Sequence, residues 1–292
     1  MKNKEQGSLV LSFDCEGKWG MSDIRTEWNS QLTDKNLIGA YKYLLEVIEE
    51  YNLQATFGLV GAFTETKEDF FQNSLHHIKG DNHLNWINHS IRRIEEDPEG
   101  WFLPEILKMI KKANKNEICS HSYCHVSMNT LDTSEALDEL LLIQNWRERN
   151  GLECSTLIYP RNLIAHTELL SKFKITKYRD VPNMISNSLI EELNIFKKGE
   201  YRREQTSRVV PGGIFVNWKY GFRKYIPNTL SLMRYKSIIN DAKRNNKVAH
   251  FWIHPHNFIT GKKTKTIFES LCKLSSQAIK AGDLEIRVMK DL

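Results

Sequence analysis

Short apolar runs alternate with amphipathic helical patterns along most of this 292-residue chain. Parallel strands joined by crossover helices are typical of this alternation, because such strands are buried on both faces and each helix buries one stripe. The runs that predict strands are one that begins at residue 9, and 55–61, 117–120, 156–159, 175–178, 248–253 and 284–288. The patterns that predict helices are 35–51, 104–114, 134–150, 167–173, 235–245 and 265–281. The order predicts an α/β protein, and an irregular (β/α) barrel rather than an open sheet.

Two helix starts carry local signals. Pro104 occupies the first turn of its helical pattern, where its missing N–H costs nothing. Ser134 is the expected N-cap of the helix that ends at Asn150-Gly151.

Length is compatible with one domain over residues 1–292, because barrel-type α/β proteins often reach this size as single units. Two segments interrupt the alternation, at about 64–100 and 181–228. Long insertions in a domain are usually functional loops, and the aromatic content here favours ordered loops that wall a substrate cleft. The histidines of the first insertion (His76, His77, His83 and His89) have no apolar strand to deliver them, so we expect them in solvated loop.

Composition narrows the class of partner. The 41 basic and 36 acidic residues leave a net charge of +5 without a nucleic-acid-binding motif, which argues against nucleic acid. No apolar stretch is long enough to span a membrane, and the N-terminus lacks the apolar core of an export signal. Five cysteines without framework spacing predict free thiols. We therefore expect a cytoplasmic protein.

Acidic and imidazole side chains stand where three apolar runs end. The first run ends in Asp14-Cys15-Glu16, a middle run leads to His121 and His125, and a late run leads to His254. Carboxylates and imidazoles are the ligands of catalytic zinc sites, and the carboxyl ends of parallel strands meet at one rim. The sequence therefore predicts a metal-assisted hydrolase site.

These segments, with Ala55-Thr56-Phe57, resemble in order and spacing the polysaccharide deacetylase family, also called the NodB-homology domain or carbohydrate esterase family 4. The resemblance runs from about residue 8 to 290. It implies an irregular (β/α) barrel of the NodB-homology type with two long loop insertions. It also implies one divalent metal ion, most commonly zinc, and an activated water that attacks an acetamide carbonyl.

The resemblance assigns Asp14 as the catalytic base and Glu16, His121 and His125 as the metal ligands. This chain departs from the family motif of two adjacent aspartates, because Cys15 stands where the second aspartate would be. Alternation along a strand puts Asp14 and Glu16 on one face, which suits a shared site. The alternative, in which Asp14 binds the metal and Glu16 acts elsewhere, stays open.

Further roles follow from the same resemblance. His254 corresponds to the family's general acid, and His256, on the same face of an extended segment, is the rival or a substrate contact. Arg161 follows a proline that it precedes in the family motif, and is expected to orient the catalytic carboxylate. Asn162 is expected at the substrate through a backbone amide, and Trp218 as the wall against the acetyl methyl group.

The expected function is removal of an N-acyl group, most commonly acetyl, from an amino sugar or sugar precursor in surface polysaccharide synthesis. Two alternatives stay open. One is hydrolysis of a non-sugar C–N amide bond on the same scaffold, and the other is a carbohydrate-binding barrel that has lost catalysis. The expected partner is a small acylated sugar, with neither nucleic acid nor a membrane span, and the oligomeric state is open.

Overall fold

The computed structural model describes residues 6–183, 185, 188–201 and 208–292. Nine strands make up its sheet: β1 (Ser8–Cys15), β2 (Thr56–Leu59), β3 (Glu117–Ser120), β4 (Thr156–Leu157), β5 (Lys177–Arg179), β6 (Val209–Val210), β7 (Ile214–Phe215), β8 (Val248–Ile253) and β9 (Glu285–Ile286). The α-helices around it are α1 (Asp34–Glu50), α2 (Lys67–Asp69), α3 (Asp81–Glu96), α4 (Pro104–Lys112), α5 (Thr133–Asn150), α6 (Ser188–Leu193), α7 (Asn228–Asn245), α8 (Asn257–Thr260) and α9 (Thr264–Lys280).

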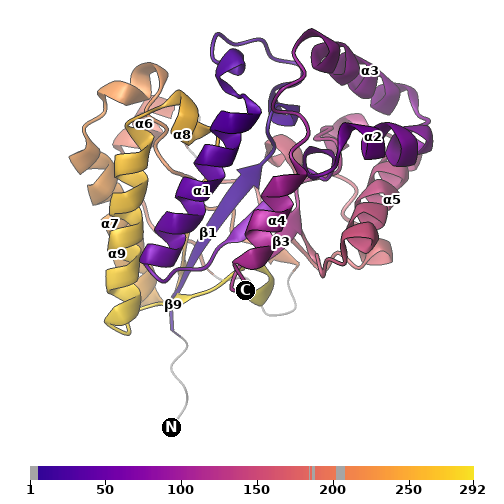
Figure 1. The fold of residues 1–292 in the computed structure, drawn as a ribbon. Coiled ribbons are helices and arrows are strands. Elements are labelled where there is room, and N and C mark those ends of the chain that lie inside the picture. The colour runs from indigo at the N-terminus through magenta and orange to yellow at the C-terminus, as the bar shows by residue number, and fades with distance from the viewer. Residues whose placement is uncertain (1–5, 184, 186–187, 202–207) are drawn as a thin grey trace.

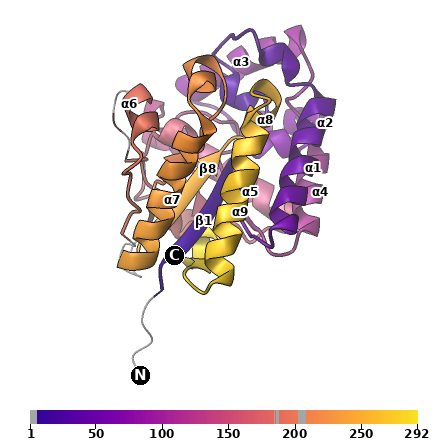
Figure 2. The same cartoon turned by 90° about the vertical axis from the view of Figure 1, so that its left-hand side faces the viewer.

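The sheet is parallel and curls on itself. Its strand order is β6-β5-β4-β3-β2-β1-β8-β7, with β9 beside β1. The two ends of this path, β6 and β7, are separated in the chain by residues 211–213 alone. Since three residues span about 10 Å at most, the ends of the sheet must lie near each other. The result is a curled half-barrel with helices outside it, which confirms the predicted fold class (Figures 1 and 2).

The register of the strands brings three motif positions to one rim. Phe13 pairs with Ile253 across β1 and β8, and Cys15 pairs with Leu59, which in turn pairs with Ser120 of β3. Glu16, His121 and His254 each follow the last residue of a strand. Parallel neighbours end at the same edge of a sheet, so these three side chains start from adjacent strand ends.

Local sequence explains how the flanking helices begin. Thr33 caps α1 by accepting a hydrogen bond from the Asn36 N–H. The N-cap of α5 is Asp132 rather than the predicted Ser134, and its carboxylate accepts the Glu135 N–H while the Glu135 carboxylate accepts the Asp132 N–H. This reciprocal pair satisfies two N–H groups that a serine two residues later would leave free.

The first insertion is largely helical and packs onto the barrel. It contains α2 and α3, and the solvated-loop prediction is wrong for His83, which is fully buried on α3. The prediction considered only delivery by an apolar strand, whereas a helix delivers His83. Its helix buries a stripe that also includes Ile87, Ser90 and Ile94, which is one face at helical spacing.

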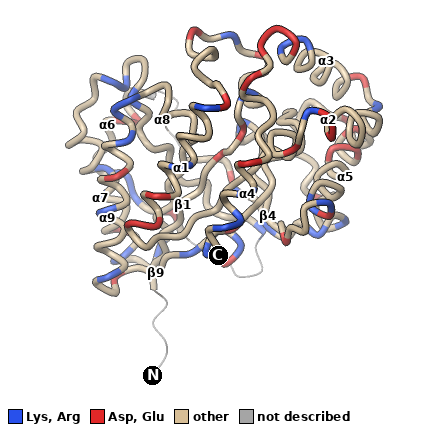
Figure 3. Tube along the Cα trace, in the orientation of Figure 1, with Lys and Arg blue, Asp and Glu red and all other residues tan. Residues whose placement is uncertain are grey.

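The second insertion adds two short strands and a helix. Within residues 181–228 lie β6, β7 and α6, while positions 184, 186–187 and 202–207 are outside the described residues. Acidic and basic residues are interspersed along the trace rather than gathered in one part (Figure 3). Among the described helices, none is long and apolar enough to cross a bilayer.

Candidate active site

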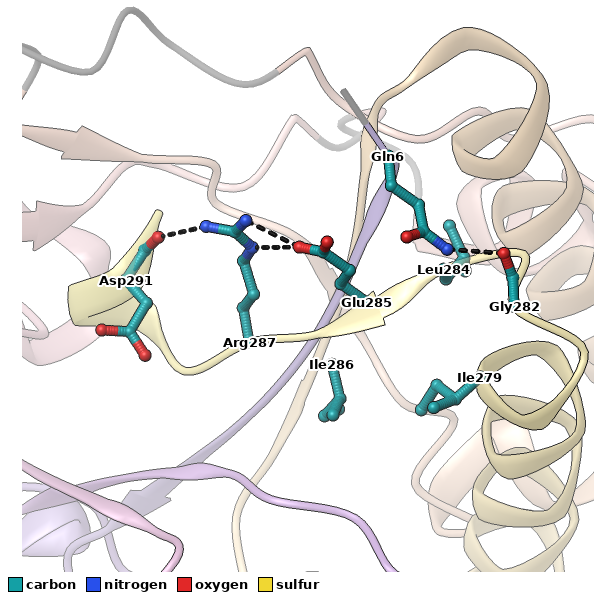
Figure 4. A pocket seen from close by; sticks show the side chains of 8 residues that line it. All are labelled: Gln6, Ile279, Gly282, Leu284, Glu285, Ile286, Arg287 and Asp291. Atoms are coloured by element: carbon teal, nitrogen blue, oxygen red, sulfur yellow. Dashed lines mark hydrogen bonds and ion pairs between the residues drawn. The ribbon is translucent and has the colours of Figure 1, made fainter. Parts of the chain in front are cut away.

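The carboxyl rim of the sheet gathers a buried carboxylate and two imidazoles. Glu16 Oε2 lies 2.9 Å from His125 Nε2 and 3.3 Å from His121 Nε2. All three side chains are buried, and one ligand atom of each lies within 4.8 Å of the others. A hollow away from this cluster, at the amino end of the sheet, is lined by Gln6 and the segment around β9 (Figure 4). There Arg287 is already held by Glu285 and the Asp291 carbonyl, and the motif residues are elsewhere.

The imidazole of His121 is oriented as a metal ligand requires. Its Nδ1 lies 2.9 Å from the Ile158 carbonyl oxygen, which accepts a hydrogen bond, so Nδ1 carries a proton and Nε2 faces Glu16. His125 also presents Nε2, and its buried Nδ1 has no hydrogen-bond partner among the described residues. A lone pair that faces a carboxylate oxygen is repelled unless a proton or a cation lies between them. The donor set therefore fits a divalent cation such as zinc.

The histidines also determine the charge state of Glu16. Burial by itself raises the pKa of this carboxyl, but His254, His125 and His121 beside it outweigh burial and lower the pKa well below its ordinary range. For His125 burial dominates and lowers the pKa, whereas burial of His121 is outweighed by its hydrogen bond to Glu16 and by the Asp14 charge, which raise the pKa. An ionised carboxylate beside a neutral imidazole is the protonation state that a metal ion needs.

Asp14 lies on the same face of β1 as Glu16, as alternation predicts, and is held by an arginine from β5. Arg179 Nη1 and Nη2 each donate to one oxygen of Asp14 at 2.7 Å, and both side chains are buried. Burial raises the pKa of Asp14, but Arg179 reverses the effect and the net shift is downward. The Cys15 thiol between the two carboxylates lies against Tyr41 of α1 instead. Asp14 is thus an ionised carboxylate in fixed orientation beside the metal-ligand cluster.

Two late histidines border the cluster in different environments. His254 Nε2 lies 3.6 Å from Glu16 Oε1, and 22% of the His254 side chain is exposed. His256 Nδ1 lies 4.0 Å from the same oxygen, but its ring is buried between Trp28 and His254. Burial and then His254 lower the pKa of His256 to about 3. His254 is therefore the imidazole that meets solvent at the cluster.

A sequence model of the polysaccharide deacetylases matches residues 30–178, about half of the chain. The chain belongs to the polysaccharide deacetylase family. The matched range contains His121 and His125 but neither Glu16 nor His254, which geometry alone connects to them. No curated protein matches the chain significantly.

Solved structures share the fold at low identity. A polysaccharide deacetylase from Mycobacterium smegmatis, described as putative, is 12% identical with a TM-score of 0.58, and the match covers 98% of this chain and 95% of that one. A family 4 carbohydrate esterase from Streptomyces lividans in complex with acetate is 11% identical with a TM-score of 0.48, covering 96% and 91%. A family 4 pseudoenzyme from Bacillus anthracis is 15% identical with a TM-score of 0.49, covering 100% and 66%.

The arginine beside Asp14 is Arg179 and not the predicted Arg161. Arg161 has a left-handed backbone conformation, with φ of 56°, and forms an ion pair with Asp23 near the Trp86 ring. Arg179 occupies the place at Asp14, packs over Trp252 with 4.7 Å between guanidinium and ring centre, and donates to Asn162 Oδ1 at 3.0 Å. The signal in the sequence is an arginine directly after a predicted strand, which ends at Tyr178.

Trp218, which was predicted to form the wall against the acetyl methyl group, is connected to the site by a series of aromatic contacts. It stacks on Tyr220 with ring centres 4.7 Å apart and meets Trp28 edge to face at 5.7 Å. Trp28 in turn stacks on His256 at 5.6 Å. Sequence reasoning missed Trp28, because it lies in an irregular segment between β1 and α1 that carries no strand or helix pattern.

Proposed function

We propose that the chain is a metal-dependent hydrolase that removes an N-acyl group, most commonly acetyl, from an amino sugar or sugar precursor in surface polysaccharide synthesis. The observation that carries the proposal is the convergence of Glu16, His121 and His125 beside the ion-paired Asp14 and the partly exposed His254. Family membership supports an acylated sugar as the substrate class.

The residues divide into binding and proton-transfer roles. Glu16, His121 and His125 would hold the cation, with zinc as the ion that this donor set fits best. When bound, such a cation polarises an amide carbonyl and lowers the pKa of water towards ~7. Asp14 has the lowered pKa of a carboxylate that is ionised at neutral pH, so it accepts the proton of the attacking water.

Leaving-group protonation falls to His254. The water oxygen forms a bond to the acyl carbon, the C–N bond breaks, and the departing nitrogen takes its proton from the imidazole. His254 Nε2 lies 3.6 Å from Glu16 Oε1 and the side chain is 22% exposed, so a substrate nitrogen has access to it. Arg179 keeps Asp14 in place and supplies the countercharge for the buried carboxylate. The products are a free amine and a carboxylate.

The test is release of acetate from a panel of N-acetylated amino sugars and sugar precursors by zinc-loaded protein. The variant Asp14→Asn should keep bound zinc and lose activity, whereas Glu16→Gln should lose both. Release from simple amides but not from sugars would favour the non-sugar amide hydrolase. Stoichiometric zinc without release from any substrate would favour the inactive carbohydrate-binding barrel and contradict the proposal.

A further inference from the structure

The loop that carries two of the proposed ligands has a strained backbone. Ser122 and His125 both adopt left-handed conformations, with φ of 65° and 58°. For residues other than glycine this conformation is unfavourable, and it persists only where the surroundings enforce it. The direction of the His125 ring therefore depends on what holds the loop.

Neighbouring elements hold the carbonyl groups of the loop. The N–H groups of Gly61 and Ala62 donate to the Ser122 and Tyr123 carbonyls at 3.1 and 2.8 Å. The indole N–H of Trp86, on α3, donates to the Cys124 carbonyl at 2.8 Å. Within the loop, Ser122 Oγ accepts the His125 N–H at 2.8 Å.

One buried carboxylate holds the opposite side. Glu139, on α5, is fully buried, and its Oε1 accepts the N–H groups of Tyr123 and Cys124 at 2.5 and 3.3 Å. Its Oε2 accepts the Cys124 thiol at 3.3 Å and lies 3.1 Å from His83 Nε2 of α3. Burial raises the pKa of Glu139, but His83 and these donors lower it overall, so the group is ionised.

His83, Cys124 and Glu139 also form a group that could hold a metal. The thiol and the imidazole N–H both donate to Glu139 Oε2, and these two hydrogen bonds account for the separations of 3.1 and 3.3 Å without an ion. The cluster therefore connects the 121–125 loop to α5 and α3 through hydrogen bonds.

We propose that Glu139, fixed by His83, is a positioning residue that holds the 121–125 loop in its metal-binding conformation. The inference rests on the proposed function and adds to it a contribution from the 64–100 insertion, which supplies His83 and Trp86. Glu139 contacts the main chain of the loop, so its removal lets the loop relax from the left-handed conformations and moves His125 relative to Glu16. Loss of such a supporting contact typically weakens metal affinity by roughly 10–100-fold.

A matched control lies one turn earlier on the same helix. Glu135 is buried, and its carboxylate accepts the N–H groups of Asn82 and Asp132 at 2.8 and 2.9 Å and the Asn82 amide at 3.0 Å. Its hydrogen bonds go to α3 and to its own helix cap, and among the described residues none joins it to residues 121–125. Glu135→Gln thus removes a buried carboxylate of similar connectivity without touching the loop.

The experiment compares zinc affinity, by competition with a chromophoric chelator, in wild type, Glu139→Gln and Glu135→Gln, well below their unfolding temperatures. Both substitutions should lower the unfolding temperature, but only Glu139→Gln should weaken zinc binding, by roughly 10-fold or more. His83→Gln, which removes one contact to Glu139, should give a smaller loss and serves if Glu139→Gln does not fold. Equal affinities in the Glu139 and Glu135 variants, or in wild type and His83→Gln, overturn the inference. A wild type that binds no zinc overturns the proposed function itself.

Discussion

Arg179 and Asp14, 165 residues apart in the chain, form a buried two-point ion pair in which each guanidinium Nη lies 2.7 Å from its own carboxylate oxygen. The pair links the end of β5 to the end of β1 across the curled sheet. It places an ionised carboxylate beside the Glu16, His121 and His125 cluster.

Arg179→Met should destabilise the protein strongly, and Arg161→Met should not. Removal of Arg179 leaves Asp14 buried without its cation, which typically costs about 3–5 kcal/mol. The Arg161 pair with Asp23 is about one-third exposed on each side, and such pairs contribute about 0–1 kcal/mol. Urea unfolding of both variants measures the difference. Similar decreases in the free energy of unfolding in the two variants would show that Asp14 does not depend on Arg179 for its countercharge.

Glu16→Gln should abolish tight metal binding. The amide is a neutral and weak ligand, so zinc affinity should fall by more than about 100-fold, beyond what changes around a metal site usually cost. Zinc per chain by elemental analysis gives the readout. Added zinc should raise the unfolding temperature of the wild type and not of the variant, because the ligand atoms converge only in the folded state. Glu27→Gln, at a surface carboxylate that accepts the Tyr220 hydroxyl, is the control and should bind zinc normally.

His254→Gln should lower kcat by roughly 10²–10⁴-fold, the usual contribution of a general acid. His256→Gln should have a much smaller effect. A buried imidazole whose pKa is lowered to about 3 is uncharged at neutral pH, so it lacks the imidazolium proton that a general acid donates. Both variants are compared at saturating zinc, with zinc content measured in parallel. A larger decrease of kcat in the His256 variant than in the His254 variant would show that His256 is the general acid.

His250 should make folding stability depend on acidity. Its ring is buried between the Ser12 hydroxyl at 2.8 Å and the Pro211 carbonyl at 2.6 Å, and burial, then Arg179, lower its pKa from 6.5 to about 3. Between these values the unfolded chain binds one proton more than the folded chain. The free energy of unfolding therefore decreases as pH falls from about 6.5 towards 3, with a slope of about 1.4 kcal/mol per pH unit for this residue.

His250→Gln should reduce that slope by about 1.4 kcal/mol per pH unit, the contribution of one proton, because glutamine keeps polar contacts and does not titrate. Urea unfolding at several pH values between 4 and 6 measures it, and an unchanged slope in the variant would contradict the assignment to His250.

Much of the fold was predictable because its signals are local. Helix 35–51, the Pro104 start and strand 248–253 are continuous apolar or amphipathic patterns, and the structure has elements there. The 167–173 pattern gave only a 3₁₀ turn over Leu170–Phe173, and β6, β7 and α3 were missed. Strands of two residues are too short to show an alternating pattern. Helix α3 is mostly polar, so its few apolar residues give only a weak helical pattern.

By itself, the amino-acid sequence determined which residues end the strands, and so which carboxylates and imidazoles reach the carboxyl rim: Asp14, Glu16, His121, His125 and His254. Strand period is enough for this, because side chains alternate and parallel strands end at one edge. Only the tertiary structure decided that Arg179 rather than Arg161 meets Asp14, and that His83 and Glu139 brace the ligand loop. Those contacts join residues from separate elements, and their partners depend on how the sheet curls and which helices pack against it rather than on any local pattern.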